Sequence, residues 1–260
     1  MKIIVCIKQV LDTAAKIKIN DGLVDAEGVP RILNPYDEFA VEEALLVRDK
    51  FLGSEITLIT LGSENSREAL KTGLAMGADK AVHLIDPAFN GLDNQGAAQI
   101  LAQAIRPMSF DLVFCGRQAV DDDMSGVGPA LAMFLGVPLV TVVTKLILEN
   151  GSAVVTRQIE GGSEVIEAAL PLVLTCQKGL NVPRLPSLKG IMAAKKKEVA
   201  VLDAKAIGFD PQKSGSIFNR VKQVDLSLPP ARKKGRILAG SPEESSVELV
   251  RILREEEKVV

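Results

Sequence analysis

The chain has 260 residues, of which 47% are hydrophobic and 25% are charged, and its formal net charge is −2. This length allows one large α/β domain with an extension or two small domains, and the composition argues against a disordered chain. A net charge so near zero gives no whole-chain argument for nucleic-acid binding, although basic residues cluster at Lys195–Lys197 and Arg232–Arg236.

The cysteines and the single histidine form no metal-binding pattern. Cys6, Cys115 and Cys176 lie far apart within apolar runs, no CxxC pair occurs, and His83 lies within an apolar run. We therefore expect no metal or iron–sulfur site, and we interpret the cysteines as buried thiols of a reducing compartment. Met1-Lys2 leads directly into a strand-like run, and no apolar run approaches the ~20 residues of a membrane span. We expect a cytoplasmic or equivalent soluble location without membrane insertion.

The chain opens with a short β-rich run at Lys2–Ile7 and a hairpin pattern at Lys16–Val24. Asn34 and Pro35 then predict the start of a helix that runs from about Tyr36 to Phe51, with Asn34 as its cap.

Strand-like and helix-like segments alternate over the next part of the chain. The predicted strands are Glu55–Leu61, Lys80–Ile85 and Asp111–Cys115, and the predicted helices are Ser63–Ala75, Asp93–Arg106 and Met124–Leu135. This alternation predicts βαβ units and a parallel sheet flanked by helices, with crevices at the carboxyl ends of its strands.

The rhythm changes after Leu139. Four strand-like segments follow, with turn signals at Asn150-Gly151 and Gly161-Gly162; they are Val140–Leu148, Ala153–Ile159, Glu164–Ala169 and Leu172–Thr175. They predict antiparallel hairpins added at the edge of the parallel sheet.

Beyond Lys178 the chain is rich in proline and in loop residues. We expect a nucleotide-binding domain over residues 1–198 and an extended arm over 199–260 that closes with a short helix at about Pro242–Glu256. The arm contains apolar residues that a solvated tail would not keep, which predicts that it lies on another surface; these residues are Ile207, Phe209, Ile217, Phe218 and Val221.

The segment Cys115–Gly128 joins a predicted strand to a predicted helix. Asp123 or Ser125 is placed to cap that helix, and Gly126 and Gly128 keep its first turn free of bulk. Backbone N–H groups at a helix start bind anions, so a phosphate could dock here. The alternative, a capped helix with an acidic loop for solubility, stays open from the motif alone.

Other chemistries find less support. GxGxxG and GxxxxGK[ST] patterns are absent at the first strand-to-helix turn, and adjacent aspartates at Asp121–Asp123 rarely point at one ion. No Ser/His/Asp arrangement is available, since we expect His83 to be a packed or edge histidine and Cys115 to serve the core. Asn34–Asp37 could line a nucleotide or an interface, but a simple capped helix explains it locally.

Residues 184–197 form an unusual surface pattern in which apolar residues stand beside lysines. The apolar group is Leu188, Ile191 and Met192, and the basic group is Lys195, Lys196 and Lys197. Such a patch suits docking against an acidic partner through a few anchors. The alternative is a solvated lysine face next to a buried turn.

Several segments resemble electron transfer flavoprotein beta subunits, in that family's order. They are Asn34–Asp37, Gly73–Asp79, Gly116–Asp123, Val155–Ile166 with Pro171–Thr175, and Asn181–Arg184 leading to Ile191–Lys197. The resemblance extends from the first strand to about residue 200, and the arm beyond matches loosely.

The resemblance implies a fold like that of the adenine nucleotide alpha-hydrolase group. It implies an alpha-subunit partner that holds most of a redox-active FAD, an arm that wraps around this partner, and a buried AMP without a redox role. The lack of a catalytic residue agrees with an electron carrier subunit that has no stand-alone catalysis, because the cofactor supplies the chemistry.

The resemblance also assigns site residues. It places the nucleotide site at Cys6, Asn34, Asp37, Leu61, Gln118, Asp121, Asp123, Met124, Ser125, Gly126, Val127 and Gly128. Thr13 and Tyr36 stand where family members approach the flavin.

Leu188 stands where the family's recognition loop places the leucine that grips acyl-CoA or other flavin dehydrogenases. Electrons would then pass towards a quinone oxidoreductase-type acceptor, as in fatty acid oxidation. Lys189-Gly190 replaces a more usual Pro-Asn pair, so the dehydrogenase is not defined.

One branch of the family bifurcates electrons and binds a second FAD and NADH in place of AMP. Its members resemble this chain at Gly116–Ala119 and Val127–Pro129, but have Gly-Asp-Thr in place of Asp122-Asp123-Met124. The bulkier triplet favours AMP, because a flavin tail needs open space beside the adenine pocket.

Two other classes use related folds. A stand-alone ATP-binding regulator of the universal stress type would lack the arm and the lysine-rich segment. A nucleotidyl-transferring enzyme of the pyrophosphatase group would need an SGGxDS-type loop near the first strand, where Lys8–Leu11 offers none.

Overall fold

The computed structural model describes residues 1–149, 151–210, 219–231 and 234–260. Asn150, Ile217, Phe218 and Arg232, which entered the predictions above, lie outside these ranges. The chain forms two compact units. The first comprises Met1–Lys18 and Val24–Val224, and the second comprises Ile19–Leu23 and Asp225–Val260.

The first unit is built on a sheet to which nine strands of the described chain contribute, in the order β11-β10-β9-β12-β8-β1-β6-β7-β13. Seven neighbouring strands pair in parallel: β1 (Lys2–Cys6), β6 (Glu55–Leu61), β7 (Lys80–Leu84), β8 (Leu112–Gly116), β9 (Leu139–Glu149), β12 (Leu172–Cys176) and β13 (Val199–Leu202). β10 (Ser152–Ile159) and β11 (Gly162–Ala169) extend one edge in antiparallel pairing. The predicted parallel α/β sheet with added hairpin strands is confirmed.

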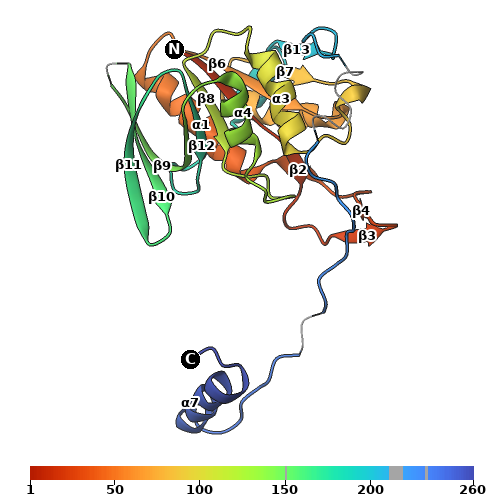
Figure 1. Ribbon diagram of the computed structural model, residues 1–260, viewed down its shortest axis with the longest axis vertical. Coiled ribbons are helices and arrows are strands. Elements are labelled where there is room, and N and C mark those ends of the chain that lie inside the picture. Colours follow the sequence, from red (N-terminus) through yellow and green to blue (C-terminus); the bar gives the residue numbers. More distant parts are fainter. Residues whose placement is uncertain (150, 211–218, 232–233) are drawn as a thin grey trace. The chain divides into compact units, whose positions relative to one another are not determined.

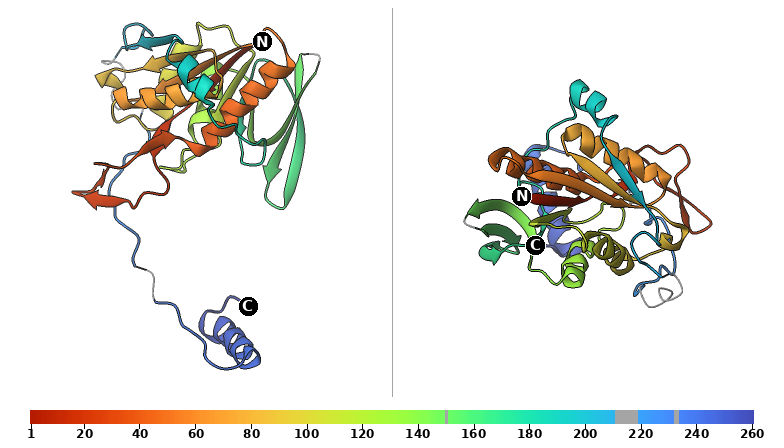
Figure 2. Two further views of the ribbon diagram at one scale, coloured as in Figure 1. Left: turned by 180° about the vertical axis from the view of Figure 1, so that it is seen from behind. Right: turned by 90° about the horizontal axis from the view of Figure 1, so that it is seen from above.

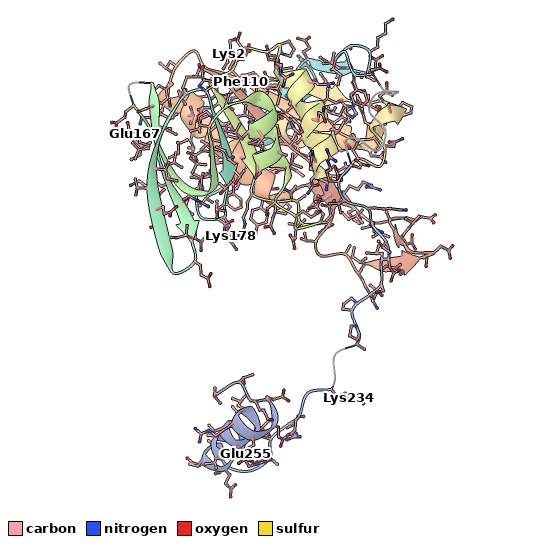
Figure 3. The ribbon with its side chains drawn as sticks, in the orientation of Figure 1. Lys2, Phe110, Glu167, Lys178, Lys234 and Glu255 are labelled. Carbon is pink, nitrogen blue, oxygen red and sulfur yellow. The ribbon has the colours of Figure 1, made fainter. Side chains whose placement is uncertain are left out.

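The order of the strands creates a switch point beside β1. From β1 the chain builds β6 and β7 on one side, and then returns to place β8 on the other side. Lys2 and Phe110 lie close to the amino ends of β1 and β8, and Lys178 lies just beyond the carboxyl end of β12. Figure 3 shows Lys2 and Phe110 together at one end of the strands and Lys178 at the other end. The carboxyl ends of β1 and β8 lie side by side there, at the end of the strands where open α/β sheets bind their ligands.

Helices cover both faces of the sheet. α1 (Pro35–Lys50) and α2 (Arg67–Met76) pack on one face, and α3 (Asn94–Ile105) and α4 (Val127–Leu135) pack on the other (Figure 1, Figure 2). Strand β1 serves both cores, because Ile3 and Val5 belong to the first and Ile4 and Cys6 to the second. This burial on two faces explains why the central strands are apolar runs without alternation.

Short elements complete the chain. They are β2 (Gln9–Leu11), β5 (Arg31–Leu33), β3 (Lys18–Asn20), β4 (Leu23–Asp25), the 3₁₀ turns Glu64–Ser66 and Pro87–Phe89, and α5 (Leu188–Ala194). β3 and β4 form the predicted hairpin, and its turn residues Asp21 and Gly22 have positive φ angles of 51° and 72°.

One strand lies elsewhere than predicted. Leu172–Thr175 was expected among antiparallel hairpins at the edge, but β12 (Leu172–Cys176) is parallel and lies between β8 and β9. All five of its residues are buried, whereas β11 at the edge is mostly exposed. The pattern of this short run reveals burial on both faces, but not the identity of the neighbouring strands.

The first unit also continues past residue 198, where a boundary was expected. β13 joins the main sheet beside β7, and Ala204 and Phe209 are buried. The ring of Phe209 meets that of Phe89 edge to face, with centroids 5.6 Å apart. Ile207 and Phe209, expected to lie on another surface, therefore pack in this chain's own second core.

The second unit ends in α7 (Pro242–Arg251), followed by one π-helical turn at Ile252–Glu256. The predicted terminal helix is confirmed. Ser241 and Glu244 form a reciprocal capping box, and Arg251 pairs with Glu248, Glu255 and Glu256. None of the helices in the described part of the chain is both long and apolar enough to cross a membrane.

Candidate functional site

A cavity of about 330 Å³ opens at the carboxyl ends of β1 and β8, at the switch point of the sheet. Its wall includes nine residues that the sequence analysis assigned to a nucleotide site: Cys6, Asn34, Asp37, Leu61, Gln118, Ser125, Gly126, Val127 and Gly128. Segments from four different places in the chain thus meet at one cavity. Its volume lies at the lower end of the ~300–1,000 Å³ typical of small-molecule sites.

The loop between β8 and α4 supplies the most distinctive part of the wall. α4 begins at Val127, three residues later than predicted, and its N-cap is Gly126 without a side-chain cap. The expected caps therefore do not form, because Asp123 and Ser125 adopt positive φ angles of 51° and 53° and turn the chain before the helix.

Four consecutive backbone N–H groups, those of Ser125–Gly128, make no hydrogen bond to any described residue. Pro129 follows and has no N–H group. Free amides at a helix start, preceded by left-handed residues, form a concave anion site to which the helix dipole adds positive potential. This part of the cavity is suited to a phosphate group.

The three aspartates of the loop point to different partners. Asp121 accepts a hydrogen bond from Lys8 Nζ at 2.7 Å, and Asp122 accepts one from the N–H of Met124 at 3.0 Å. Asp123 accepts from Gln118 Nε2 at 2.5 Å. Asp122 lines the cavity, whereas Asp121, Asp123 and Met124, which were expected at the nucleotide, are not in its wall.

Asn34 plays a different part from the predicted helix cap. It occupies the N-cap position of α1, but its side chain makes no capping bond. Instead Nδ2 donates to the carbonyl of Gln118 at 2.9 Å, and Oδ1 accepts from the N–H of Val120 at 3.2 Å. Asn34 thus fixes the loop after β8, which is 84 residues away in sequence.

Asp37 joins the ends of β1 and β8. Its carboxylate accepts from the N–H of Lys8 at 2.7 Å and from the N–H of Gly116 at 3.1 Å. Its side chain is buried, and this burial raises the pKa of Asp37 to about 7, against the lowering effect of the two N–H donors. A side chain at Gly116 would collide with the Asp37 carboxylate and with the backbone of Tyr36. Only glycine fits this contact.

The rest of the lining includes an apolar part. Cys6, Leu61 and Cys115 come from strand ends, and Phe89, Leu92 and Leu101 come from the segment between β7 and the middle of α3. Such a wall can enclose a flat aromatic base. The sequence analysis missed the Phe89–Asn94 segment, although its Asn90-Gly91 turn signal follows a predicted parallel strand and so lies at the same edge of the sheet.

The described thiols are unsuited to nucleophilic chemistry. Cys6, Cys115 and Cys176 are free and buried, as predicted. A hydrogen bond with Cys115 and burial raise the pKa of the Cys6 thiol well above its usual value. His83 is fully buried, and its Nε2 lies 3.2 Å from the carbonyls of Gly62 and Ser63. It is a packed histidine behind the cavity wall.

Thr13 and Tyr36, the expected flavin neighbours, are not part of the cavity wall. Thr13 is exposed in the segment between β2 and β3. Tyr36 is half-buried in the first turn of α1.

The expected docking segment contains α5, whose cap is Ser187. Leu188, Ile191 and Met192 expose 77%, 46% and 63% of their surface, so the apolar group indeed faces outward. Lys195 and Lys196 are exposed beside it.

Lys197 differs from its two neighbours. Its Nζ donates to the carbonyls of Leu74 at 3.0 Å and Ala78 at 2.5 Å, at the end of α2. Partial burial lowers the pKa of Lys197. This lysine closes a helix end within its own chain, as cations near a helix C-terminus commonly do.

The base of the segment is fastened to α1. Arg184 Nε and Nη2 form a paired salt bridge with the buried carboxylate of Glu42, at 2.8 and 2.9 Å. Asn181 Nδ2 donates to the carbonyl of Phe39 and to Glu43. The exposed apolar group of α5 is therefore carried on an anchored support.

The class of protein follows from a match to a known domain family. The Electron transfer flavoprotein domain model matches residues 21–207, which include most of the sheet and the loop after β8.

The relatives extend over the whole chain. The electron transfer flavoprotein subunit beta of Bacillus subtilis is 39% identical over 261 residues and covers all of both chains. That of Sus scrofa is 35% identical and covers 98% of this chain and 97% of its own. The caffeyl-CoA reductase-Etf complex subunit CarD of Acetobacterium woodii is 41% identical over 93% of each chain. The chain belongs to the electron transfer flavoprotein beta-subunit family, as its motifs indicated.

Proposed function

We propose that this chain works as the beta subunit of a two-subunit electron transfer flavoprotein and holds AMP as a structural nucleotide in the cavity at β1 and β8. The observation that carries the proposal is the row of free amides at Ser125–Gly128 inside that cavity. A phosphate satisfies these donors, and the apolar wall from Cys6 to Leu101 accommodates the adenine. AMP contributes no electrons, so its role is to complete the packing of the site.

The size of the cavity favours AMP over a second FAD. FAD has about twice the bulk of AMP, and the cavity volume of about 330 Å³ lies at the lower end of the ~300–1,000 Å³ range of small-molecule sites. Asp123 is held by Gln118 beside the cavity, where the tail of a flavin would need space.

The redox cofactor belongs to the other subunit in this proposal. An alpha subunit holds most of the FAD, and the arm with α7 clasps that subunit. Val247, Val250 and Ile237 expose 72%, 50% and 95% of their surface, which provides an apolar contact for it. Thr13 and Tyr36 approach the flavin from this chain, which has no catalytic residue of its own.

The exposed group of α5 docks the electron donor, an acyl-CoA or other flavin dehydrogenase, as in fatty acid oxidation. Leu188 is its central anchor, with Ile191, Met192 and the exposed Lys195 and Lys196 around it. The reduced carrier passes its electrons to a quinone oxidoreductase-type acceptor. The complex works in the cytoplasm or an equivalent soluble compartment.

One experiment tests the nucleotide and the partner together. The full-length chain is co-expressed with its alpha subunit, the purified complex is denatured, and the released FAD and AMP are quantified. One FAD and one AMP per heterodimer support the proposal. Two FAD without AMP would replace it with an electron-bifurcating subunit that uses NADH, and a monomer that binds ATP would remove the carrier role.

The docking surface is tested with matched leucine variants. Leu188→Ala should reduce the rate of flavin reduction by the dehydrogenase about tenfold at limiting carrier concentration, because it truncates a central anchor. Leu52→Ala changes another highly exposed leucine, outside α5 and at 93% exposure, and serves as the control. Equal rates for both variants and the unaltered complex would exclude Leu188 as an anchor.

A further inference from the structure

Lys8 has a position that the predicted nucleotide site did not include. It lies two residues beyond the end of β1, its backbone N–H donates to Asp37, and it lines the same cavity as the free amides of Ser125–Gly128. Its ammonium group lies 2.7 Å from Asp121 and 3.5 Å from Asp122. The cation therefore stands beside the loop that supplies the amides.

The charges of this loop oppose the binding of a phosphate. Asp121, Asp122 and Asp123 bring three carboxylates within seven residues of Gly128. Like charges at this range disfavour a dianion, while the free amides favour it. A cation beside the loop offsets this repulsion.

Among the described residues, the basic side chains that line the cavity are those of Lys8 and Arg117. The guanidinium of Arg117 points to Gln177 beyond β12, with an Nη1 to Oε1 distance of 3.5 Å. Lys8 is the one whose charged group contacts the phosphate-binding loop.

The ion pairs of Lys8 can be exchanged at low cost. The side chains of Lys8, Asp121 and Asp122 are 43%, 39% and 30% exposed, and ion pairs at such sites stabilise a protein by only about 0–1 kcal/mol. The flexible lysine stem lets the ammonium turn to a new partner without movement of the backbone. A phosphate at the amides carries more charge than either carboxylate.

We infer that Lys8 is a phosphate-binding residue of this cavity, whose ammonium group exchanges Asp121 and Asp122 for the phosphate of a bound adenylate. This inference rests on the proposed nucleotide site and adds a specificity to it. The site selects phosphorylated adenosines, and adenosine itself gains nothing from Lys8. The shared chemistry is the phosphate next to the ribose, whether AMP or FAD supplies it.

The experiment compares ligands with and without phosphate. The heterodimer of the full-length chain is freed of nucleotide and titrated with AMP, FAD and adenosine by calorimetry. Lys8→Met should weaken binding of the phosphorylated ligand about tenfold or more, since a charge-assisted hydrogen bond is lost, and should leave adenosine within about twofold. Lys8→Arg keeps the charge and should restore most of the affinity.

A second variant separates this role from simple support of the loop. In Asp121→Asn with Asp122→Asn, Lys8 is released and the repulsion falls, so affinity for AMP should rise. If Lys8 only held the loop, the double variant and Lys8→Met would both weaken AMP and adenosine alike, and the inference would be wrong. If the unaltered heterodimer bound none of the three ligands, the nucleotide site itself would fail, independently of Lys8.

Discussion

Asp37 fixes the geometry of the cavity through a single carboxylate that meets two strand ends. It accepts hydrogen bonds from the backbone N–H groups of Lys8, two residues beyond the end of β1, and of Gly116, the last residue of β8. These strands meet at the switch point, so Asp37 ties the segment after β1 to the end of β8. The contact requires a glycine at position 116 and a carboxylate at position 37.

Gly116→Ala should displace the residues that line this part of the cavity. The added methyl group meets the Asp37 carboxylate and the backbone of Tyr36, and backbone cannot give way as a flexible side chain can. We expect a loss of about 1–3 kcal/mol in the free energy of unfolding, as in overpacked cores, together with loss of the bound nucleotide. Gly162→Ala is the control, because nothing lies within 4 Å of its added methyl group. Chemical denaturation and nucleotide content give the answer, and equal stability of the two variants would contradict the contact.

Asp37 should also make stability depend on pH. Burial raises its pKa to about 7 from an ordinary value of 3.8, so between these pH values the folded protein holds a proton that the unfolded chain releases. Its contribution favours folding most below about pH 4 and is lost as the pH rises through 7, at no more than about 1.4 kcal/mol per pH unit.

The measurement is the difference in free energy of unfolding between the unaltered chain and Asp37→Asn, followed from pH 4 to 8. The difference should fall as pH rises to 7 and level off above it. A difference that is constant over the whole range would mean that Asp37 is ionised throughout.

Sequence patterns predict the type of each secondary-structure element and its order along the chain. They do not predict which strands lie next to each other in the sheet. The run Glu55–Leu61 is a strand over the residues predicted, because apolar β-branched residues bounded by turns have few other solutions. The position of β12 between β8 and β9 depends on pairings over long sequence distances, which no local pattern encodes. The start of α4 was displaced for a related reason, since the left-handed turns at Asp123 and Ser125 come before the helix.

The candidate site shows the same limit. The residues after β1 and β8 could be predicted from position alone, because the carboxyl ends of parallel strands share an edge. The partners of Asn34 and Lys8 could not, since they lie 84 and 113 residues away along the chain. Composition likewise makes Lys195–Lys197 one basic cluster, although the structure divides it.

Lys197 stabilises the end of α2, whereas Lys195 and Lys196 are exposed. Lys197→Met leaves the carbonyls of Leu74 and Ala78 without their cationic donor, and it should lower the free energy of unfolding by about 1–2 kcal/mol. Lys196→Met changes an exposed neighbour and should be nearly neutral in stability. Thermal or urea denaturation distinguishes the two. Equal stability of both variants would return Lys197 to the exposed docking group.

For the whole molecule, the buried residues show which part of the chain forms the hydrophobic cores and which part does not. Every buried apolar residue in the described part of the chain lies at or before Phe209, and all of them except Val10 belong to the two cores of the first unit. The second unit has a capped helix and local ion pairs but contributes no residue to either core. We propose that the exposed apolar residues of this segment contact the alpha subunit.

Deletion of residues 225–260 should therefore leave the first unit folded and abolish assembly. Because both cores stay complete, the shortened chain should keep its far-UV circular dichroism and a melting temperature within a few degrees of the full chain. Because the proposed clasp is gone, it should no longer co-elute with the alpha subunit in size-exclusion chromatography.

Val247→Asp is the matched variant for this deletion, since it retains the full length and places a charge on a side chain of α7 that is 72% exposed. A charge buried without a partner at an interface is costly, so this variant should also fail to bind the alpha subunit while its own fold is unchanged. Co-elution of the shortened chain with the alpha subunit would place the contact on the first unit instead. Unfolding of the shortened chain would show that the second unit supports the cores, which the burial of its residues does not lead us to expect.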